Sequence, residues 1–427
     1  MIYGMYQGQF MEFIELNEEE YVQFQQSHPY ANFSNSIESI RIREKQGWNC
    51  KLFGVKRDGK IVAATPLAST KIMKVFQYFD TLRGFLIDYE DLELLQFFSD
   101  HIKAYAKKNN GLFLAMSPHV VFQEVDSNGK PLDSTNVKQN IIDNLETVGF
   151  SHKGFLHEFN NTGVMPFEYS LYINGMNEEE LLNHFTQPTR YTINKTKRQG
   201  VSVRNLNRDE LDTFIDIVNA TADKRGFGGL MREREHYYDM YDYYGDTLDV
   251  LMAYINTESF IENTLKEAEV LKNTIDETDK DLMDKPNNKK LLNKKKEFTA
   301  QYEANQKRYH EMLDLQKEYG KEIPLAVGMF LYYPYEVSYL FSGGVDAFMK
   351  YDGPYAIQWH TLQKAIQKGI NHYNFYGFSG DFSKHANDRG VLEYKMGFNG
   401  ILEQMIGEFV MPINEKAYAL YKKIKKL

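Results

Sequence analysis

The side chains that could do chemistry in this sequence are mainly basic and aromatic residues placed beside glycines. The stretch HYNFYGFSGDF, residues 372–382, puts an aromatic run directly before Gly377 and Gly380. A Walker loop needs GxxxxGK[ST], and a dinucleotide loop needs GxGxxG leading into a helix, so neither pattern is met. On pattern alone the stretch is a strand end with a flexible backbone. Ligands bind at such strand ends in α/β sheets.

A lysine between aromatic residues follows in EYKMGFNG, residues 393–400. We interpret this segment as a strand and expect Lys395 to place a positive charge near Phe375 and the glycine loop. The alternative is a surface lysine without a role, which is less expected between aromatic neighbours.

Two further segments concentrate positive charge. In MREREHYYDMYDYYG, residues 231–245, Arg232 can fork onto phosphates beside tyrosines that stack or donate hydrogen bonds. In TRYTINKTKRQG, Arg190 and Lys195 could hold phosphates or an RNA backbone. The alternative in each case is a solvated or ion-paired helix face, and the pattern alone favours neither.

Several other kinds of site find no support. The single cysteine, Cys50, excludes an internal disulfide and a cysteine-rich metal site, and we expect it in the core. The 11 histidines show no HExxH or HxH spacing, so we expect no metal. A coenzyme A loop of the form [Q/R]xxGx[G/A] is met neither by residues 198–203 nor by residues 224–229. We therefore expect no cofactor.

Strand and helix patterns around these residues predict an α/β protein. A β-hairpin is expected to turn at RDGK, residues 57–60, and a further strand to cover residues 76–79. Strand–helix units of similar kind occur before and after about residue 153. This repetition suggests two related α/β halves.

A different segment interrupts the second half between residues 257 and 322. Glycine is almost absent there, and apolar residues recur at spacings of three and four, which predicts a seam along helices. DKPNNKK, residues 284–290, is the natural reversal. We expect a coiled-coil hairpin of two antiparallel helices with a lysine-rich tip. The tip lysines could contact tRNA, or they could simply aid solubility.

Bulk properties set broad limits. The chain has 427 residues and a net charge of −9, which argues against a protein that coats nucleic acid but leaves room for a basic patch. Apolar runs stay below the roughly 18 residues needed to cross a membrane. The start, MIYGMYQGQF, lacks the pattern of a secretory signal, and we expect a leader with the domain beginning near Met11. A single cysteine fits a reducing compartment, so we expect the cytoplasm.

Taken in order, these motifs resemble the Fem family of peptidoglycan branching enzymes. The motifs are MKVFQYF, RGFLIDYE, SYLFSGG, YAIQW, YNFYGFSG and YKMGFNG, together with the hairpin, and they span nearly the whole chain. The resemblance implies two GNAT-like domains packed together. The first would cover residues 1–153, with about 402–427 packed back on it. The second would cover 154–256 and 323–401, with the coiled-coil hairpin at 257–322 inserted.

The resemblance also implies a reaction. Such enzymes transfer an amino acid from aminoacyl-tRNA to an amine of a lipid-linked or UDP-linked peptidoglycan precursor, on the stem peptide or an existing branch. It implies peripheral contact with the inner face of the membrane, and homo- or hetero-oligomers with related enzymes. The alternatives are an immunity or interaction protein of the same fold, and a coenzyme A-dependent N-acyltransferase, which the missing loop disfavours. The amino acid and the acceptor position stay open.

The resemblance assigns roles to individual residues. It places Lys395 at the acceptor site as the catalytic residue. Relatives often carry Asp-Pro where this chain has Ser117, so an acidic base at that place cannot be assumed. The residues expected to bind substrate are Phe375, Arg232, Tyr339 (with Phe341 competing for its place), Arg43, Tyr237, Gly377 and Gly380. Those expected to bind tRNA are Lys289, Lys290, Lys294, Lys295, Arg190 and Lys195.

Overall fold

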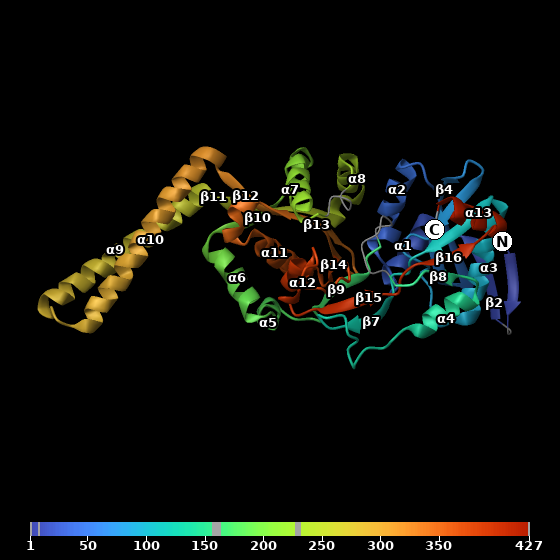
Figure 1. Ribbon diagram of the computed structural model, residues 1–427, viewed down its shortest axis with the longest axis horizontal. Helices are drawn as coiled ribbons and strands as arrows, with labels where there is room; N and C mark the ends of the chain where they lie inside the picture. Colours follow the sequence, from blue (N-terminus) through green and yellow to red (C-terminus); the bar gives the residue numbers. More distant parts are fainter. Residues whose placement is uncertain (1, 7–8, 156–163, 227–231, 426–427) are drawn as a thin grey trace.

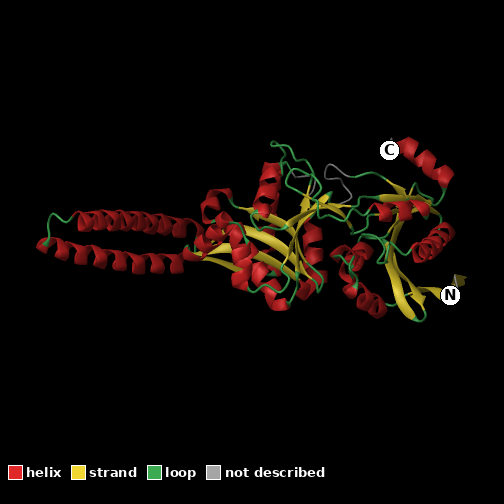
Figure 2. Ribbon diagram, turned by 90° about the horizontal axis from the view of Figure 1, so that it is seen from below, coloured by secondary structure: helices red, strands yellow, loops and turns green. Residues whose placement is uncertain are grey.

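Two mixed β-sheets lie side by side along the molecule, and a long helical hairpin projects from the second (Figure 1). The computed structural model describes residues 2–6, 9–155, 164–226 and 232–425. The hairpin extends the long axis of the molecule in both views (Figures 1 and 2). The expected α/β class with two halves is confirmed.

The first sheet has eight strands, and all its pairs are antiparallel except β5 with β6. Helix α3 buries Leu94, Leu95, Phe98 and Ile102, spaced by three and four, against this sheet. The strands in spatial order are β1 Ile2–Tyr6, β2 Gln9–Glu15, β3 Asn49–Arg57, β4 Lys60–Ile72, β5 Phe76–Asp80, β6 Gly111–Met116, β16 Phe409–Pro412 and β8 Ser151–His152. The helices of this half are α1 Glu18–Ser27, α2 Ile37–Lys45, α3 Leu92–Lys108, α4 Gln139–Thr147 and α13 Glu415–Lys425.

The second sheet also has eight strands, with one parallel pair between β13 and β14. Its strands in spatial order are β10 Val201–Asn205, β11 Leu248–Asn256, β12 Glu322–Tyr332, β13 Val337–Gly344, β14 His372–Phe378, β9 Phe167–Tyr172, β15 Ile401–Met405 and β7 Val121–Val125. Its helices are α5 Glu178–His184, α6 Gln187–Arg198, α7 Leu211–Arg225, α8 Arg234–Tyr244, α11 Gly353–Lys368 and α12 Arg389–Met396.

The chain crosses between the two sheets more than once. Strand β7 comes early in the sequence yet pairs with β15 at the edge of the second sheet. Strands β15 and β16 follow each other in sequence but belong to different sheets. Residues 2–6, which we expected to precede the domain, form β1 and pair with β2. The division at residue 153 stays a prediction, and these crossings tie the two halves together.

The helical hairpin joins two neighbouring strands, β11 and β12. It consists of α9 Thr257–Asp284 and α10 Lys289–Tyr319. The turn between these helices falls within residues 284–290, where the sequence predicted it. Asn305 lies fully buried between the helices and donates to the Thr264 carbonyl at 3.1 Å and to Glu267 at 2.9 Å. Its Oδ1 has no hydrogen-bond partner among the described residues, so the buried amide is only partly satisfied. A single polar residue of this kind in an apolar seam favours one register over others.

One element differs from the expectation. The segment around Lys395, which we expected to be a strand, forms helix α12, so that prediction was wrong. Leu392 and Lys395, three residues apart, share the buried face of this helix, whereas the strand interpretation followed the alternation of aromatic residues. Gly397 follows at a close approach, because a Cβ there would lie 2.2 Å from Thr189 Oγ1.

Candidate functional site

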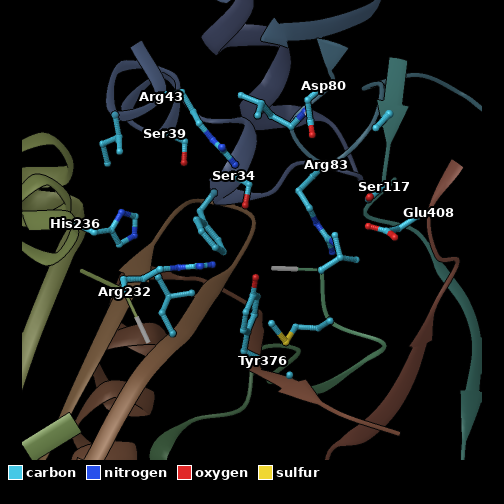
Figure 3. Close-up of a pocket in the computed structure, with 18 of the residues that line it drawn as sticks. Ser34, Ser39, Arg43, Asp80, Arg83, Ser117, Arg232, His236, Tyr376 and Glu408 are labelled. Carbon is cyan, nitrogen blue, oxygen red and sulfur yellow. The ribbon is translucent and has the colours of Figure 1, made fainter. Parts of the chain in front are cut away.

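A cavity of about 1130 Å³ lies between the two halves of the molecule. Arg43 and Arg83 reach it from the first half, and Arg232 and Lys395 line it from the second. Figure 3 shows the three arginine side chains extending into the same space from different elements. The cavity is therefore positively charged and is built by both halves together.

Many of the residues expected to bind substrate do line this cavity. They are Arg43, Arg232, Tyr339, Phe375, Gly377 and Lys395, and Phe341 and Ser117 line it too. Tyr237 and Gly380 are outside its lining. Tyr237, a residue of α8, is fully buried and packs against Phe214 and Phe341, so it fixes this helix to the core. A Cβ on Gly380, whose φ is +85°, would lie 2.6 Å from a ring carbon of Phe167, so this glycine is required by packing.

The two arginines expected to contact phosphates are held by different means. Arg43 comes from α2, and its guanidinium carbon lies 5.1 Å from the centroid of the Trp48 ring. Arg232 lies two residues before the start of α8, and its backbone N–H donates to the Tyr237 hydroxyl at 3.4 Å. Both side chains keep their guanidinium groups in the cavity (Figure 3), where bidentate hydrogen bonds to a phosphate can form.

Lys395 is 4% exposed, and its ammonium donates to the carbonyls of Tyr376 at 2.9 Å and Gly377 at 2.7 Å. It therefore lies beside Gly377 at the end of β14, where the sequence analysis expected a positive charge. Burial lowers the pKa of Lys395 to about 7, against the opposing charges of Asp388 and Glu168. An ammonium has three donors, so one is left for a group bound in the cavity.

Arg83 is a cavity residue to which our sequence analysis gave no role. It follows β5 with φ +76°, and its side chain is 7% exposed. Its Nη2 donates to Glu168 Oε1 at 3.0 Å, while its buried Nε has no hydrogen-bond partner among the described residues. The only sequence signal was that it opens the RGFLIDYE motif, which served the family resemblance alone.

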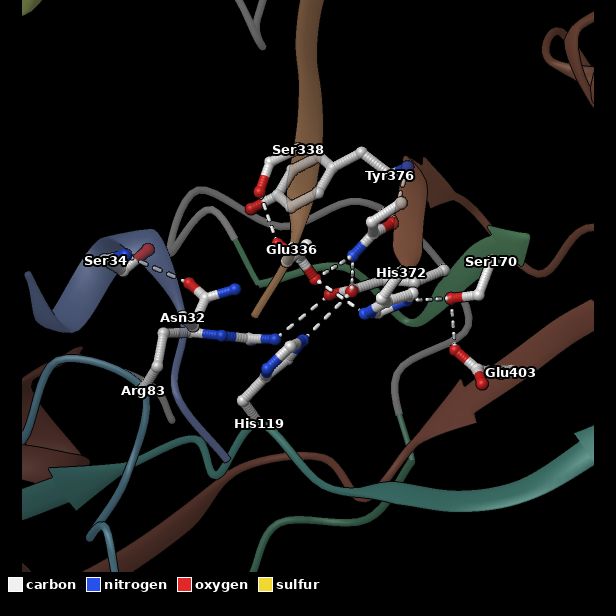
Figure 4. A network of polar contacts seen from close by, with 12 residues as sticks. Asn32, Ser34, Arg83, His119, Ser170, Glu336, Ser338, His372, Tyr376 and Glu403 are labelled. Atoms are coloured by element: carbon white, nitrogen blue, oxygen red, sulfur yellow. Dashed lines mark hydrogen bonds and ion pairs between the residues drawn. The ribbon is translucent and has the colours of Figure 1, made fainter. Parts of the chain in front are cut away.

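Glu168 connects the two halves through buried hydrogen bonds from Arg83 and Asn374. Figure 4 shows the surrounding network, into which Arg83 and His119 extend from the first half. The second oxygen of Glu168 accepts from His119 Nε2 at 3.2 Å and from Asn374 Nδ2 at 2.6 Å. Burial alone would raise the pKa of Glu168, but His119, Arg83 and the Asn374 hydrogen bond lower it to about 2. The pKa of His119 is raised, because Glu168 outweighs the effect of burial. The carboxylate is thus charged and paired with cations from the other half.

Other cavity residues were also absent from our expectations. His236 faces the cavity near Arg232 (Figure 3), and burial together with Arg232 lowers its pKa to about 4. The carboxylates of Asp80 and Glu408 lie on the opposite wall. His236 lies within the segment 231–245, of which the sequence analysis considered only the arginine and the tyrosines, whereas Asp80 and Glu408 belong to no motif.

The residues expected to bind tRNA lie away from this cavity. Lys289, Lys290 and Lys294 are exposed at the start of α10, at the tip of the hairpin. Lys295 forms an ion pair with Asp279 at 2.6 Å. The remaining two are engaged on α6, where Lys195 pairs with Asp352 at 2.6 Å and Arg190 donates to the Asn183 carbonyl at 3.0 Å.

The structure also bears on the alternatives. Residues 198–203 join the end of α6 to the start of β10, so a pyrophosphate there would meet the negative end of a helix dipole. Residues 227–229 of the second candidate loop lie outside the described residues.

Cys50 is half-buried, and burial raises the pKa of its thiol to about 12, which suits packing rather than nucleophilic attack.

The described residues offer neither a membrane span nor a metal site. None of their helices is long and apolar enough to cross a membrane. Within the same residues, no cluster of three or more His, Cys, Asp or Glu side chains is arranged to hold a metal ion.

We predict that the Glu168 network makes the protein acid-sensitive. The pKa of Glu168 is lowered from 4.5 to about 2, so its contribution to stability is complete above about pH 4.5 and is lost as the pH falls toward 2. Glu168→Gln should lower the free energy of unfolding by roughly 3–5 kcal/mol at pH 6, because it leaves buried cations uncompensated. Urea unfolding between pH 2 and 7 measures both effects.

The contribution of His119 to stability depends on pH in the opposite direction to that of Glu168. Its pKa is raised, so its contribution is present below the ordinary value of 6.5 and is lost as the pH rises through the folded value. A Glu168→Gln variant that unfolds at the same urea concentration as the unchanged protein at every pH would show that the network contributes no stability.

Comparisons with known proteins agree with the arrangement. The model of the FemAB family matches residues 16–426. The chain is 33% identical over 418 residues to an aminoacyltransferase FemA of Staphylococcus epidermidis, covering 98% of this chain and 100% of the relative. A FemA of Staphylococcus aureus is 32% identical, with 98% and 99% covered. The crystal structure of FemX superposes with a TM-score of 0.81 at 22% identity, covering 96% of this chain and 99% of that one. The expected enzyme class, an aminoacyltransferase, is confirmed, and the chain belongs to the FemAB family.

Proposed function

We propose that this protein transfers an amino acid from aminoacyl-tRNA to an amine of a lipid-linked or UDP-linked peptidoglycan precursor. The observation that carries the proposal is the cavity between the two halves, which gathers guanidinium groups from both. Its volume of about 1130 Å³ suits a large ligand with several anionic groups. The names of the FemA relatives support aminoacyl transfer.

The reaction is aminolysis of an ester. The acceptor amine, protonated near pH 7, must lose a proton before it attacks the ester carbonyl. A tetrahedral oxyanion then forms, and it collapses as the ribose oxygen of the tRNA leaves. The ester is already reactive, so holding the two substrates in line can supply much of the acceleration.

The cavity offers groups for each step. Arg43 and Arg232 suit the phosphates of the precursor, because guanidinium groups bind phosphate oxygens in pairs. Lys395 carries a donor toward the cavity that would stabilise a phosphate or the developing oxyanion. Asp80 and Glu408 on the opposite wall are acceptors for the proton of the amine.

We propose that the hairpin tip contacts the tRNA. Lys289, Lys290 and Lys294 are exposed there, and the chain as a whole carries a net charge of −9. A local basic patch on an acidic protein would direct an anionic partner to one place.

Peripheral contact with the inner face of the membrane is also proposed, through helix α13. Its Leu420 and Ile424 are 54% and 60% exposed, and exposed lysines flank them at Lys416, Lys423 and Lys425. The opposite face of the helix lines the cavity with Tyr418 and Tyr421. A membrane-bound α13 would hold the cavity beside lipid headgroups. Self-association and pairing with related enzymes stay predictions of the resemblance.

The first test concerns Lys395. Lys395→Met should lower transfer from radiolabelled aminoacyl-tRNA to a lipid-linked precursor by at least about 100-fold, because it removes a buried positive charge from the site. Calorimetry with the UDP-linked precursor should show affinity falling as the pH rises through about 7, as the ammonium deprotonates. The variant should lack that pH dependence.

Lys364→Met is the control, since Lys364 pairs with Asp249 away from the cavity lining. Turnover of Lys395→Met close to that of the control would remove the proposed role. Failure of the unchanged protein to transfer any amino acid from a panel of aminoacyl-tRNAs would refute the function itself, and would favour the interaction-protein alternative.

The second test concerns the hairpin tip. Lys289→Ala with Lys290→Ala should weaken aminoacyl-tRNA binding and reduce the slope of log affinity against log salt by up to about 1.8, since each lost phosphate contact removes roughly 0.7–0.9. Lys272→Ala with Lys307→Ala makes the same charge change on exposed positions of the hairpin stem. Equal slopes in both pairs would reduce the tip to a structural arm.

The third test concerns α13. Lys416→Glu, Lys423→Glu and Lys425→Glu together should lower partitioning onto vesicles of phosphatidylglycerol by two orders of magnitude or more, at roughly 1 kcal/mol per lysine. Co-sedimentation measures this, with phosphatidylcholine vesicles as the uncharged control. Unchanged partitioning of the triple variant would place any membrane contact elsewhere.

A further inference from the structure

One buried carboxylate, Glu168, is connected by hydrogen bonds to two of the cations that line the cavity. Glu168 lies on β9, is 1% exposed and is not among the residues that line the cavity. Its Oε1 accepts from Arg83, and its Oε2 accepts from Asn374. Neither contact is to a solvent-exposed group, so both geometries are fixed by the fold.

The Asn374 amide passes this constraint on to the end of β14. Its Nδ2 donates to Glu168 at 2.6 Å and to Glu336 at 3.0 Å, which fixes the orientation of the amide. The amide oxygen then accepts from the backbone N–H of Tyr376 at 2.7 Å. Because the nitrogen must face two carboxylates, the oxygen must face Tyr376.

The backbone of Tyr376 has an unusual conformation, and its carbonyl accepts a hydrogen bond from the Lys395 ammonium. Tyr376 has φ +62°, a region that residues other than glycine seldom occupy. The ladder between β14 and β9 is irregular between Asn374 and Gly377. This turn directs the carbonyls of Tyr376 and Gly377 at the Lys395 ammonium. The Asn374 hydrogen bond is what holds the turn in this conformation.

We propose that Glu168 is a positioning residue, which sets Arg83 directly and Lys395 through Asn374 and the Tyr376 turn. The inference rests on the proposed function for its kinetic consequence, but the geometry itself is independent of any substrate. Arg83 then acts as a cation for an anionic group in the cavity, since its buried Nε is without a partner among the described residues. His119 anchors the same carboxylate from the first half, so closure of the two halves and placement of the cations are one event.

The amide of a glutamine cannot replace this carboxylate. In Glu168→Gln one oxygen becomes an NH₂ group, which would face either Arg83 or the Asn374 amide nitrogen. Both are donors, so one contact is lost in either orientation. If Asn374 turns to recover its bond, its NH₂ meets the Tyr376 N–H and the turn is released.

The matched control is Glu403. It lies opposite Glu168 in the register of β15 and β9, is 4% exposed, and accepts from Ser170 and Tyr172. It contacts neither Arg83 nor Asn374 among the contacts of the described residues. Glu403→Gln therefore removes a buried carboxylate from the same sheet without breaking a direct contact of Arg83 or Asn374, because Glu403 is linked to Asn374 only through Ser170, His372 and Glu336.

We expect Glu168→Gln to lower kcat by about 100-fold, the loss that a displacement near 1 Å can cause, and Glu403→Gln to stay within about threefold. Asn374→Ala keeps the pairing of Glu168 with Arg83 and His119, so it tests the Lys395 branch alone. All variants are measured at a temperature where near-UV circular dichroism shows the native signal.

The second readout needs no turnover. Competitive acylation of lysines, followed by peptide mass spectrometry, gives the pH at which Lys395 becomes half-reactive, near 7 in the unchanged protein. Glu168→Gln should move this midpoint to lower pH, because the Glu168 charge favours the ammonium. Glu403→Gln should leave it in place. Asn374→Ala should move it too, since it releases the carbonyls that bind the ammonium.

The outcomes separate two failures. An unchanged Lys395 midpoint in both Glu168→Gln and Asn374→Ala overturns the relay, whatever the enzyme turns over. Equal losses of kcat in Glu168→Gln and Glu403→Gln would show that any buried carboxylate of this sheet matters equally, and would also overturn it. Shifted midpoints without transfer by the unchanged protein would retain the relay and reject the proposed function.

Discussion

The buried charge of Glu168 is the constraint on which the arrangement of the two halves depends. A carboxylate removed from water is costly unless it is paired and hydrogen-bonded, and here the partners come from different parts of the chain. Arg83 and His119 approach from the first half, and Asn374 lies in the second sheet beside β9. The two halves must close around this group for the carboxylate to be satisfied.

Closure of the halves also creates the cavity. Arg43 and Arg83 belong to one half and Arg232 to the other, and they share one space only when the halves meet (Figure 3). Like charges repel each other in such a space, and an anionic substrate placed between the guanidinium groups would reduce this repulsion. Lys395 beside this space has a pKa near 7 for a different reason, because burial removes its ammonium from water.

The crossing strands give this arrangement its rigidity. Strand β7 leaves the first half to pair with β15, and the chain returns from β15 to β16 in the first sheet. In all, the chain passes between the sheets four times, after β6, β7, β8 and β15, and several passages restrict hinge motion more than one linker would. The hairpin, by contrast, joins the rest of the molecule only at β11 and β12, so it can reach a large partner without disturbing the cavity.

The sequence by itself determined the local features of this protein. The three- and four-residue spacing predicted α9 and α10, and the turn at Asp58 and Gly59 predicted the β3–β4 hairpin, because such signals act between near neighbours. Through the family resemblance, the sequence also identified Arg43, Arg232 and Lys395 as candidate site residues. It failed at α12, where aromatic alternation competed with the helical spacing of Leu392 and Lys395. Only the tertiary structure decided the Glu168 network, because its contacts join residues 85 and 206 positions apart and no local pattern encodes which distant partner a buried carboxylate will find.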